Sequence, residues 1–167
     1  EIGSGLVGSE MCIRDRLEVN NMSYEIKPGL SIGQIQLGMD RNKVNELITE
    51  LEEWKDTPYG YKKEVIYDCN DDFQIMYDDD LRVSFILCTS PELLTMLGKC
   101  LNSELFYEDI LEMIKAQDPS IEEDEEGFIS NELGFGLNFD YDDDEQIFIT
   151  CVQVAVKDFW ANEPCEE

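Results

Sequence analysis

Apolar and polar residues follow two different periods along this chain, and the first clear stretch has the period of a helix. Its apolar residues recur at intervals of three and four positions, at Val44, Leu47, Ile48 and Leu51. This spacing places them on one helical face, and Asp40 is a typical N-cap residue because its carboxylate can accept the first free backbone N–H groups. The pattern therefore predicts a helix over residues 41–54, which ends before Thr57 and Pro58.

The next segment has the alternation of β-strands. Three extended stretches are predicted, at residues 64–69, 73–77 and 81–88, with polar turns at 70–72 and 78–80. Ahead of the predicted helix, residues 24–38 contain a Pro28-Gly29 turn and favour a short extended pair. The first half of the chain is therefore expected to be an extended pair, a helix and an antiparallel meander.

The second half repeats this order of elements. A helical stripe of Ile110, Met113 and Ile114 ends at Asp118-Pro119, and strand-like stretches follow at residues 127–131, 135–141 and 146–156. The stretch beginning at Tyr77 aligns with the stretch beginning at Tyr141, at an offset of 64 residues. We therefore predict an α+β fold made of two tandem helix-plus-antiparallel-β-meander repeats, in one two-layer domain with the Asp turns at one rim. The alternative that stays open is that two short acidic hairpins are alike by chance.

One segment resembles known proteins. Residues 26–48, IKPGLSIGQIQLGMDRNKVNELI, resemble the opening of small bacterial proteins that begin with a Pro-Gly turn, an Ile-Gly…Leu-Gly-Met segment and a capped helix. The tandem plan is similar to the fold of β-lactamase-inhibitory proteins and outer-membrane-assembly lipoproteins. Such groups include immunity proteins that block the toxins of competing cells, so the resemblance implies this fold and this class of function. The lipid-anchored Cys of the assembly lipoproteins has no counterpart here, which disfavours a role in outer-membrane assembly.

The first residues differ in character from the rest. Residues 6–16 resemble the peptide obtained when sequencing-adapter DNA is translated, and Glu18 precedes Met22 at the spacing of a ribosome-binding site read in frame. We therefore expect translation to begin at Met22, with residues 1–21 non-native and disordered. Residues 22–167 are expected to form a single domain, with repeats at about 22–90 and 91–160 and an acidic tail at 161–167.

Charge narrows the function classes. The chain has 39 Asp and Glu against 12 Lys and Arg, for a net charge of −27. This balance disfavours direct binding to nucleic acid or to an anionic membrane, because the phosphate term is repulsive. No apolar run approaches the roughly 20 residues of a membrane-spanning helix. The chain has six cysteines, but without Cys12, which lies in the segment expected to be non-native, the remaining five at 69, 88, 100, 151 and 165 are odd in number and widely spaced, which favours reduced thiols in a cytoplasm.

Metal, cofactor and catalytic motifs are not predicted. The acidic stretches 68–79 and 140–151 resemble calcium loops, but Phe73 and Glu145 stand at the sixth position, where the sharp turn needs Gly. Without His and without a close Cys pair, a zinc site has no ligands. No phosphate-binding loop is found, so we expect no cofactor and no enzymatic activity. Paired carboxylates acting as a hydrolase remain the less favoured alternative.

The acidic runs are therefore the candidate binding surface. We expect a basic, toxin-like protein partner to contact three acidic runs and two aromatic anchors: Glu122, Glu123, Asp124, Glu125, Glu126, Asp78, Asp79, Asp80, Asp142, Asp143, Asp144, Tyr107 and Trp160. The function predicted from this surface is a non-catalytic, cytoplasmic immunity-type inhibitor. The open alternative is a housekeeping interaction or scaffold domain, whose acids are solvated faces that serve solubility.

Overall fold

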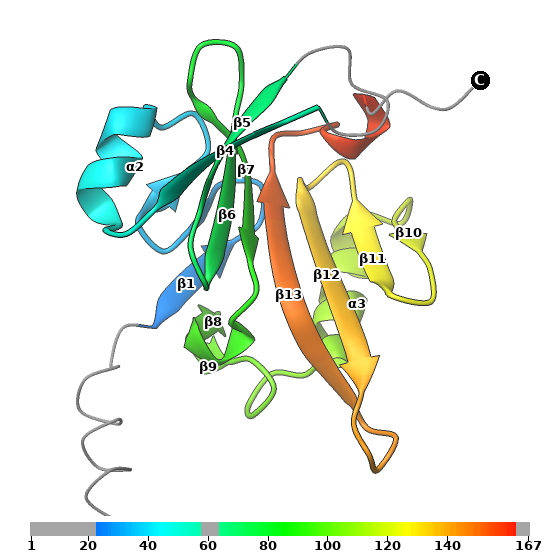
Figure 1. Cartoon of the computed structure of the whole chain (residues 1–167). Coiled ribbons are helices and arrows are strands. Elements are labelled where there is room, and N and C mark those ends of the chain that lie inside the picture. Colours follow the sequence, from blue (N-terminus) through cyan, green and yellow to red (C-terminus); the bar gives the residue numbers. More distant parts are fainter. Residues whose placement is uncertain (1–22, 58–63, 163–167) are drawn as a thin grey trace, which may run out of the picture.

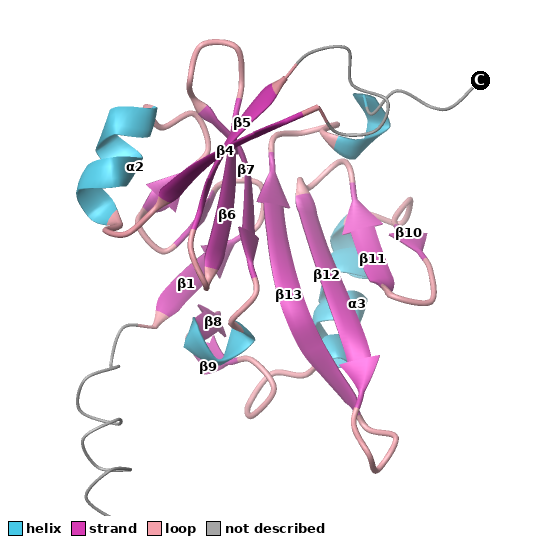
Figure 2. Ribbon diagram, in the orientation of Figure 1, coloured by secondary structure: helices cyan, strands magenta, loops and turns pink. Residues whose placement is uncertain are grey.

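A computed structural model describes residues 23–57 and 64–162 of the chain, and within them it is a mixed α+β structure in which strands predominate (Figures 1 and 2). Its α-helices are α2 (Arg41–Leu47) and α3 (Tyr107–Gln117), and its 3-10 turns are η1 (Pro91–Leu93) and η2 (Trp160–Asn162). The predictions for residues 1–21 lie outside the described residues, as does the end of the acidic tail.

Eight antiparallel strands form the larger sheet, in the spatial order β10-β11-β12-β13-β7-β6-β5-β4. In chain order they are β4 (Glu52–Asp56), β5 (Val65–Cys69), β6 (Phe73–Tyr77), β7 (Val83–Cys88), β10 (Glu122–Glu123), β11 (Gly127–Ser130), β12 (Phe135–Tyr141) and β13 (Ile147–Ala155). Each half of the chain contributes four consecutive strands, and the two groups meet through their last strands, β7 and β13. The six strands predicted by alternation are confirmed to within two residues at each end.

Five short strands form a second sheet, in the order β3-β2-β1-β8-β9. They are β1 (Tyr24–Lys27), β2 (Ser31–Ile32), β3 (Ile35–Gln36), β8 (Leu94–Met96) and β9 (Lys99–Cys100). The predicted extended pair is confirmed, because β1 pairs antiparallel with β2 across the Pro28-Gly29 turn. Strand β8 then pairs with β1 in parallel, which joins the start of the chain to its middle.

The first helix is shorter than predicted. Asp40 caps it as expected, and its Oδ1 accepts the Asn42 N–H at 2.9 Å. The helix ends at Leu47, and residues 52–54, predicted to be its end, belong instead to edge strand β4 (Glu52–Asp56). Glu50 has a left-handed φ of 66°, and all five residues of β4 pair with β5. Strand pairing with a distant segment therefore prevails over the local helical pattern.

The second helix agrees with its prediction. Helix α3 ends at Gln117, directly before Asp118-Pro119, and it buries Ile110 and Ile114 completely. In Figure 1, α3 lies behind β12 and β13. The apolar stripe predicted from the sequence therefore packs α3 into the core.

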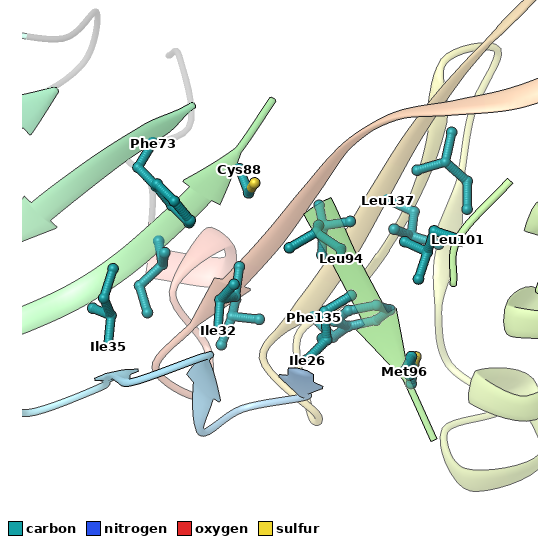
Figure 3. Packing of buried hydrophobic residues seen from close by; sticks show 14 of the residues in the cluster. Ile26, Ile32, Ile35, Phe73, Cys88, Leu94, Met96, Leu101, Phe135 and Leu137 are labelled. Carbon is teal, nitrogen blue, oxygen red and sulfur yellow. The ribbon is translucent and has the colours of Figure 1, made fainter. Parts of the chain in front are cut away.

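A single buried cluster draws on both halves of the chain. Figure 3 shows Ile32 and Phe73 from the first half in the same cluster as Phe135 and Leu137 from the second. A backbone contact adds to this link: the Gly29 N–H donates to the Gly134 carbonyl at 3.3 Å. Gly134 has a φ of 58°, and a Cβ there would lie 2.1 Å from the Ala155 carbonyl oxygen, so a side chain would force this turn away from the end of β13.

Candidate binding surface

The two aspartate triads form hairpin turns of the same geometry. In each triad the first Asp accepts two backbone N–H bonds through Oδ1, and the residue after the triad has a left-handed φ of about 60°. The donors are Asp80 and Arg82 to Asp78, and Asp144 and Gln146 to Asp142, at 2.9–3.0 Å. Asp78 and Asp142 therefore shape the backbone. All six aspartates of the two triads are exposed.

The triads lie at opposite ends of the sheet, so the prediction of one acidic rim is wrong. The turn at 78–80 joins β6 to β7, and the turn at 142–144 joins β12 to β13. Phe85, near the start of β7, pairs with Ala155 at the far end of β13, because these strands are antiparallel. The two turns consequently point in opposite directions, as Figure 1 shows.

The third acidic run lies near the 142–144 turn. Glu122 and Glu123 form β10 at one edge of the sheet, and the loop that follows returns to Gly127. Asp124 Oδ1 accepts two N–H bonds of this loop, and Glu123 forms an ion pair with Lys115 of α3 at 2.6 Å. All five side chains of the run are exposed. Part of its charge is therefore already compensated within the chain.

The two predicted aromatic anchors occupy different environments. Tyr107 is 6% exposed and packs against Phe128 and Phe139, with ring centroids 5.8 and 4.6 Å apart. Burial, followed by nearby carboxylates, raises the pKa of Tyr107 to about 12. Trp160 is half-buried and lies edge-on to Phe85 at 6.4 Å. Tyr107 therefore belongs to the core in this structure, and Trp160 borders the surface.

The strand register defines a sheet face that points away from the buried cluster. Trp54, Tyr67, Met76 and Phe85 occupy directly paired positions on β4, β5, β6 and β7; we name them the Trp54 row. Their neighbours along the strands, such as Ile75 and Ile86, are fully buried on the other face. We call the face that carries the Trp54 row the uncovered face, because the buried residues of α2 and α3 belong to the cluster on the opposite face. Phe159, beside η2, stacks on Phe85 at 5.0 Å and covers one end of the row.

Exposure rises along the row toward the edge of the sheet. Phe85 and Tyr67 are each 9% exposed, whereas Trp54 on edge strand β4 is 62% exposed. Because residues 41–54 were predicted to form a helix, Trp54 was not recognised as a possible contact for a partner. The signal available in the sequence was the alternation of Glu52, Trp54 and Asp56, which places the three on one face of a strand.

Three hollows on the uncovered face are lined by carboxylates. One, of about 480 Å³, contains Glu50, Glu52, Asp71 and Asp72 beside Trp54. A second, of about 540 Å³, contains Glu64, Asp78, Asp79 and Asp80 beside Met76 and Phe159. The third, of about 310 Å³, contains Glu125, Glu126 and Asp140. Among the described residues, neither Lys nor Arg lines these three hollows.

Arginine 41 lies on the opposite, covered face in a polar cluster that sequence reasoning missed. Its Nε and Nη2 donate to the two carboxylate oxygens of Asp68, at 2.8 and 2.5 Å, and Nη2 also donates to Glu53 at 2.7 Å. The Tyr77 hydroxyl donates to Asp68 at 2.8 Å. Asp68 is only 2% exposed, so this carboxylate is compensated by a bidentate partner and a hydroxyl.

The same contacts shift the pKa values of the cluster. The hydrogen bond to Asp68 raises the pKa of Arg41 above its ordinary range. Burial, and then the bond to Asp68, raises the pKa of Tyr77 as well. The Arg41 bond, assisted by Lys55, lowers the pKa of Glu53. The cluster is therefore an ion pair that holds the start of α2 against β5.

The cysteine thiols of the described residues are free. Cys88 is fully buried, and burial raises its pKa to about 12, so the thiol is a weak nucleophile at neutral pH. Within residues 23–57 and 64–162, no group of three Cys, Asp or Glu side chains is arranged to hold a metal ion.

Comparisons with protein-family models, with curated proteins and with solved structures found no match. Helices α2 and α3, like the 3-10 turns of the described part, are all too short to cross a bilayer.

Proposed function

We propose that this protein is a non-catalytic, cytoplasmic binding protein that acts as an immunity-type inhibitor of a basic bacterial toxin. The observation that carries the proposal is the segregation of charge on the uncovered face. Three separate hollows there are lined by four, four and three carboxylates, and no described Lys or Arg lines any of them. Concave regions lined by one sign of charge focus the electrostatic potential and attract an oppositely charged partner.

Two basic residues of the α2 and β4 region are engaged elsewhere. Arg41 is bonded to Asp68 and Glu53 on the covered face, and Lys55 on β4 lies 3.4 Å from Glu53. Neither Arg41 nor Lys55 therefore neutralises the acidic side chains of the uncovered face. A cationic partner would gain both faster association and specificity from such a field, and both would weaken with salt.

The hydrolase alternative has less support. A carboxyl that works as a general acid needs a pKa raised toward neutrality. Hydrogen bonds from Arg41, Ser120 and Ser130 instead lower the pKa of Glu53 and of Asp118, so these two carboxyls do not suit that role. The scaffold alternative uses the same acidic surface, and it differs from the proposal in having no toxin as its partner.

We also propose that the two halves of the chain arose from one duplicated unit. Each consists of a helix and four antiparallel strands, and the two units meet through β7 and β13. The turns at Asp78 and Asp142 share their hydrogen-bond pattern at the offset of 64 residues noted in the sequence. Duplication would have given the sheet acidic turns at both ends.

The gene neighbourhood tests the toxin assignment. A gene for a large secreted toxin directly adjacent to this gene supports the proposal and supplies the partner for measurement. An unrelated metabolic or ribosomal neighbourhood overturns it in favour of the scaffold alternative. The adjacent toxin, once purified, should bind the full chain with an affinity that falls steeply as salt rises.

Charge reversal then tests the acidic surface. Replacing residues 122–126 with Lys should weaken toxin binding by well over tenfold, because five exposed carboxylates at the edge of the sheet become repulsive. Isothermal titration calorimetry measures the change, and circular dichroism checks the fold. Unchanged affinity would remove this loop from the interface.

A further inference from the structure

The most exposed aromatic side chain described on the uncovered face lies between two of its acidic hollows. Trp54 is 62% exposed and lines the first hollow, whereas Met76, two strands away, lines the second. The paired positions Trp54, Tyr67 and Met76 connect the hollows across β4, β5 and β6. Acidic hollows therefore lie at both ends of a row of aromatic and aliphatic side chains.

We propose that this surface, from the Glu52 hollow across Trp54 to the Glu64 hollow, docks a basic protein segment in which Lys or Arg side chains flank an aromatic or aliphatic one. The proposal rests on the function proposed above and names the part of the uncovered face that contributes most to affinity. It differs from the sequence-based prediction, which assigned the contact to the acidic runs and to Tyr107 and Trp160.

Charge complementarity identifies the occupant. Eight carboxylates line the two hollows, four in each, without a described Lys or Arg among the lining residues. Ammonium and guanidinium groups match these carboxylates, and either can also lie over the face of the Trp54 indole. A neutral or acidic segment would bury the row at the cost of leaving the carboxylates uncompensated.

The dimensions suit an extended segment. Trp54 and Met76 are two strand spacings apart, which is about 10 Å. About three residues of extended chain cover that distance. Two cationic side chains three or four positions apart would therefore reach the two hollows while the side chain between them contacts the row.

Trp54 is also the kind of residue that dominates binding energy. Tryptophan is over-represented among the few residues that carry most of an interface's affinity, and such residues are surrounded by contacts that exclude water. Tyr67 and Phe85 support the row from nearly buried positions, at 9% exposure each. The anchor would thus bind against a rigid floor.

The test uses the full chain and synthetic peptides. The probe is a fluorescein-labelled peptide in which Lys-Arg pairs flank a central Phe at the spacing above, and fluorescence anisotropy measures its binding at low and high salt. A peptide with Gln in place of Lys and Arg, and one with Ser in place of Phe, are the matched probe controls. Binding of the first peptide should exceed that of both controls by tenfold or more.

Matched variants locate the contact. Trp54→Ala should weaken peptide binding at least tenfold, whereas Leu97→Ala, at a residue 69% exposed on the β8–β9 turn, should change it less than twofold. The pair Glu52→Gln and Glu64→Gln should weaken binding several-fold at low salt and less at high salt. The pair Glu46→Gln and Glu112→Gln, at exposed positions on α2 and α3, is the charge-matched control.

A spectroscopic measurement reports the contact directly. The chain has two Trp residues, so a ¹⁵N correlation spectrum contains two indole N–H signals, and Trp54→Ala assigns them. The Trp54 signal should shift on addition of the basic peptide, and the Trp160 signal should shift less.

The outcomes separate the two proposals. Equal effects of Trp54→Ala and Leu97→Ala, or no shift of the Trp54 signal, overturn this docking surface while toxin binding by the intact chain still supports the proposed function. Failure of the intact chain to bind the basic peptide likewise overturns the docking surface. A gene neighbourhood without a toxin overturns the proposed function, and peptide binding that requires Trp54 would then assign the same surface to a basic partner of another kind.

Discussion

The two helices secure the same sheet in different ways. Helix α2 has seven residues and buries only Val44, and its first residue, Arg41, attaches it to β5 through Asp68. Helix α3 has eleven residues and buries Ile110 and Ile114 completely, together with Tyr107. The first attachment is polar and directional, whereas the second is apolar and depends on area and packing.

The difference affects the surface as well as the core. Because α2 ends early, the chain that follows is free to form β4, which becomes an edge strand and exposes Trp54. Tyr107 lies on the same face of α3 as Ile110 and Ile114, so it is buried in the core with them. The first half of the molecule therefore exposes an aromatic side chain, Trp54, whereas the second half buries one, Tyr107.

The largest expected effect comes from the apolar attachment. Ile114→Ala should destabilise the fold by about 2–5 kcal/mol, because it deletes fully buried groups and leaves a cavity. Leu47→Ala, at a position 39% exposed on α2, should cost less than about 1 kcal/mol. Urea denaturation of both variants measures the contrast. Similar costs would show that the two helices are secured alike.

The polar attachment should give an intermediate effect. Asp68→Asn removes the negative charge to which Arg41 donates two hydrogen bonds. We expect the free energy of unfolding to fall by about 1–3 kcal/mol, since Glu53 and partial solvent contact still compensate the guanidinium. Tyr77→Phe removes one hydroxyl donor to the same carboxylate and should cost about 1 kcal/mol. A larger loss for Tyr77→Phe than for Asp68→Asn would contradict the ion pair as the main attachment.

The smallest expected effect concerns the end of α3 and depends on pH. Hydrogen bonds from Ser120 and Ser130 lower the pKa of Asp118. The ionised carboxylate therefore adds stability above the ordinary aspartate pKa, and this stability is lost as pH falls through the lower pKa of the folded state.

Asp118→Asn should accordingly cost about 1 kcal/mol at neutral pH, and the difference from the unmodified chain should shrink in acid, below pH of about 4. Asp143→Asn, at an exposed turn residue, is the control. Urea titrations across the pH range give the difference. A penalty that grows on acidification would contradict this assignment.

Local patterns predicted much of the fold. Alternation located six strands of the larger sheet, and the stripe of Ile110 and Ile114 located α3, because in each case the local pattern agrees with the pairing or packing that the segment finds. The same method failed for residues 48–54. Their apolar spacing is helical, but the backbone groups of β4 bond to β5, a partner that no local pattern reveals.

The candidate surface was less predictable than the strands. The acidic runs were recognised, and their turn geometry is local, since Asp78 and Asp142 bond to backbone only a few residues away. Their relative position was not predicted, because it depends on the antiparallel pairing of β7 with β13. The Trp54 row was missed for the same reason: it exists only once four strands are in register.

Properties that depend on near neighbours in the chain could thus be inferred from the residues: the net charge, the hairpin turns, the alternating strands and the cap at Asp40. The tertiary structure decided which side chains face a partner. Tyr107 and Trp54 are both large aromatic residues within acidic sequence, yet one is 6% exposed and the other 62%. Burial depends on contacts between segments far apart in the chain, and those contacts form only when the strands have paired and the core has packed.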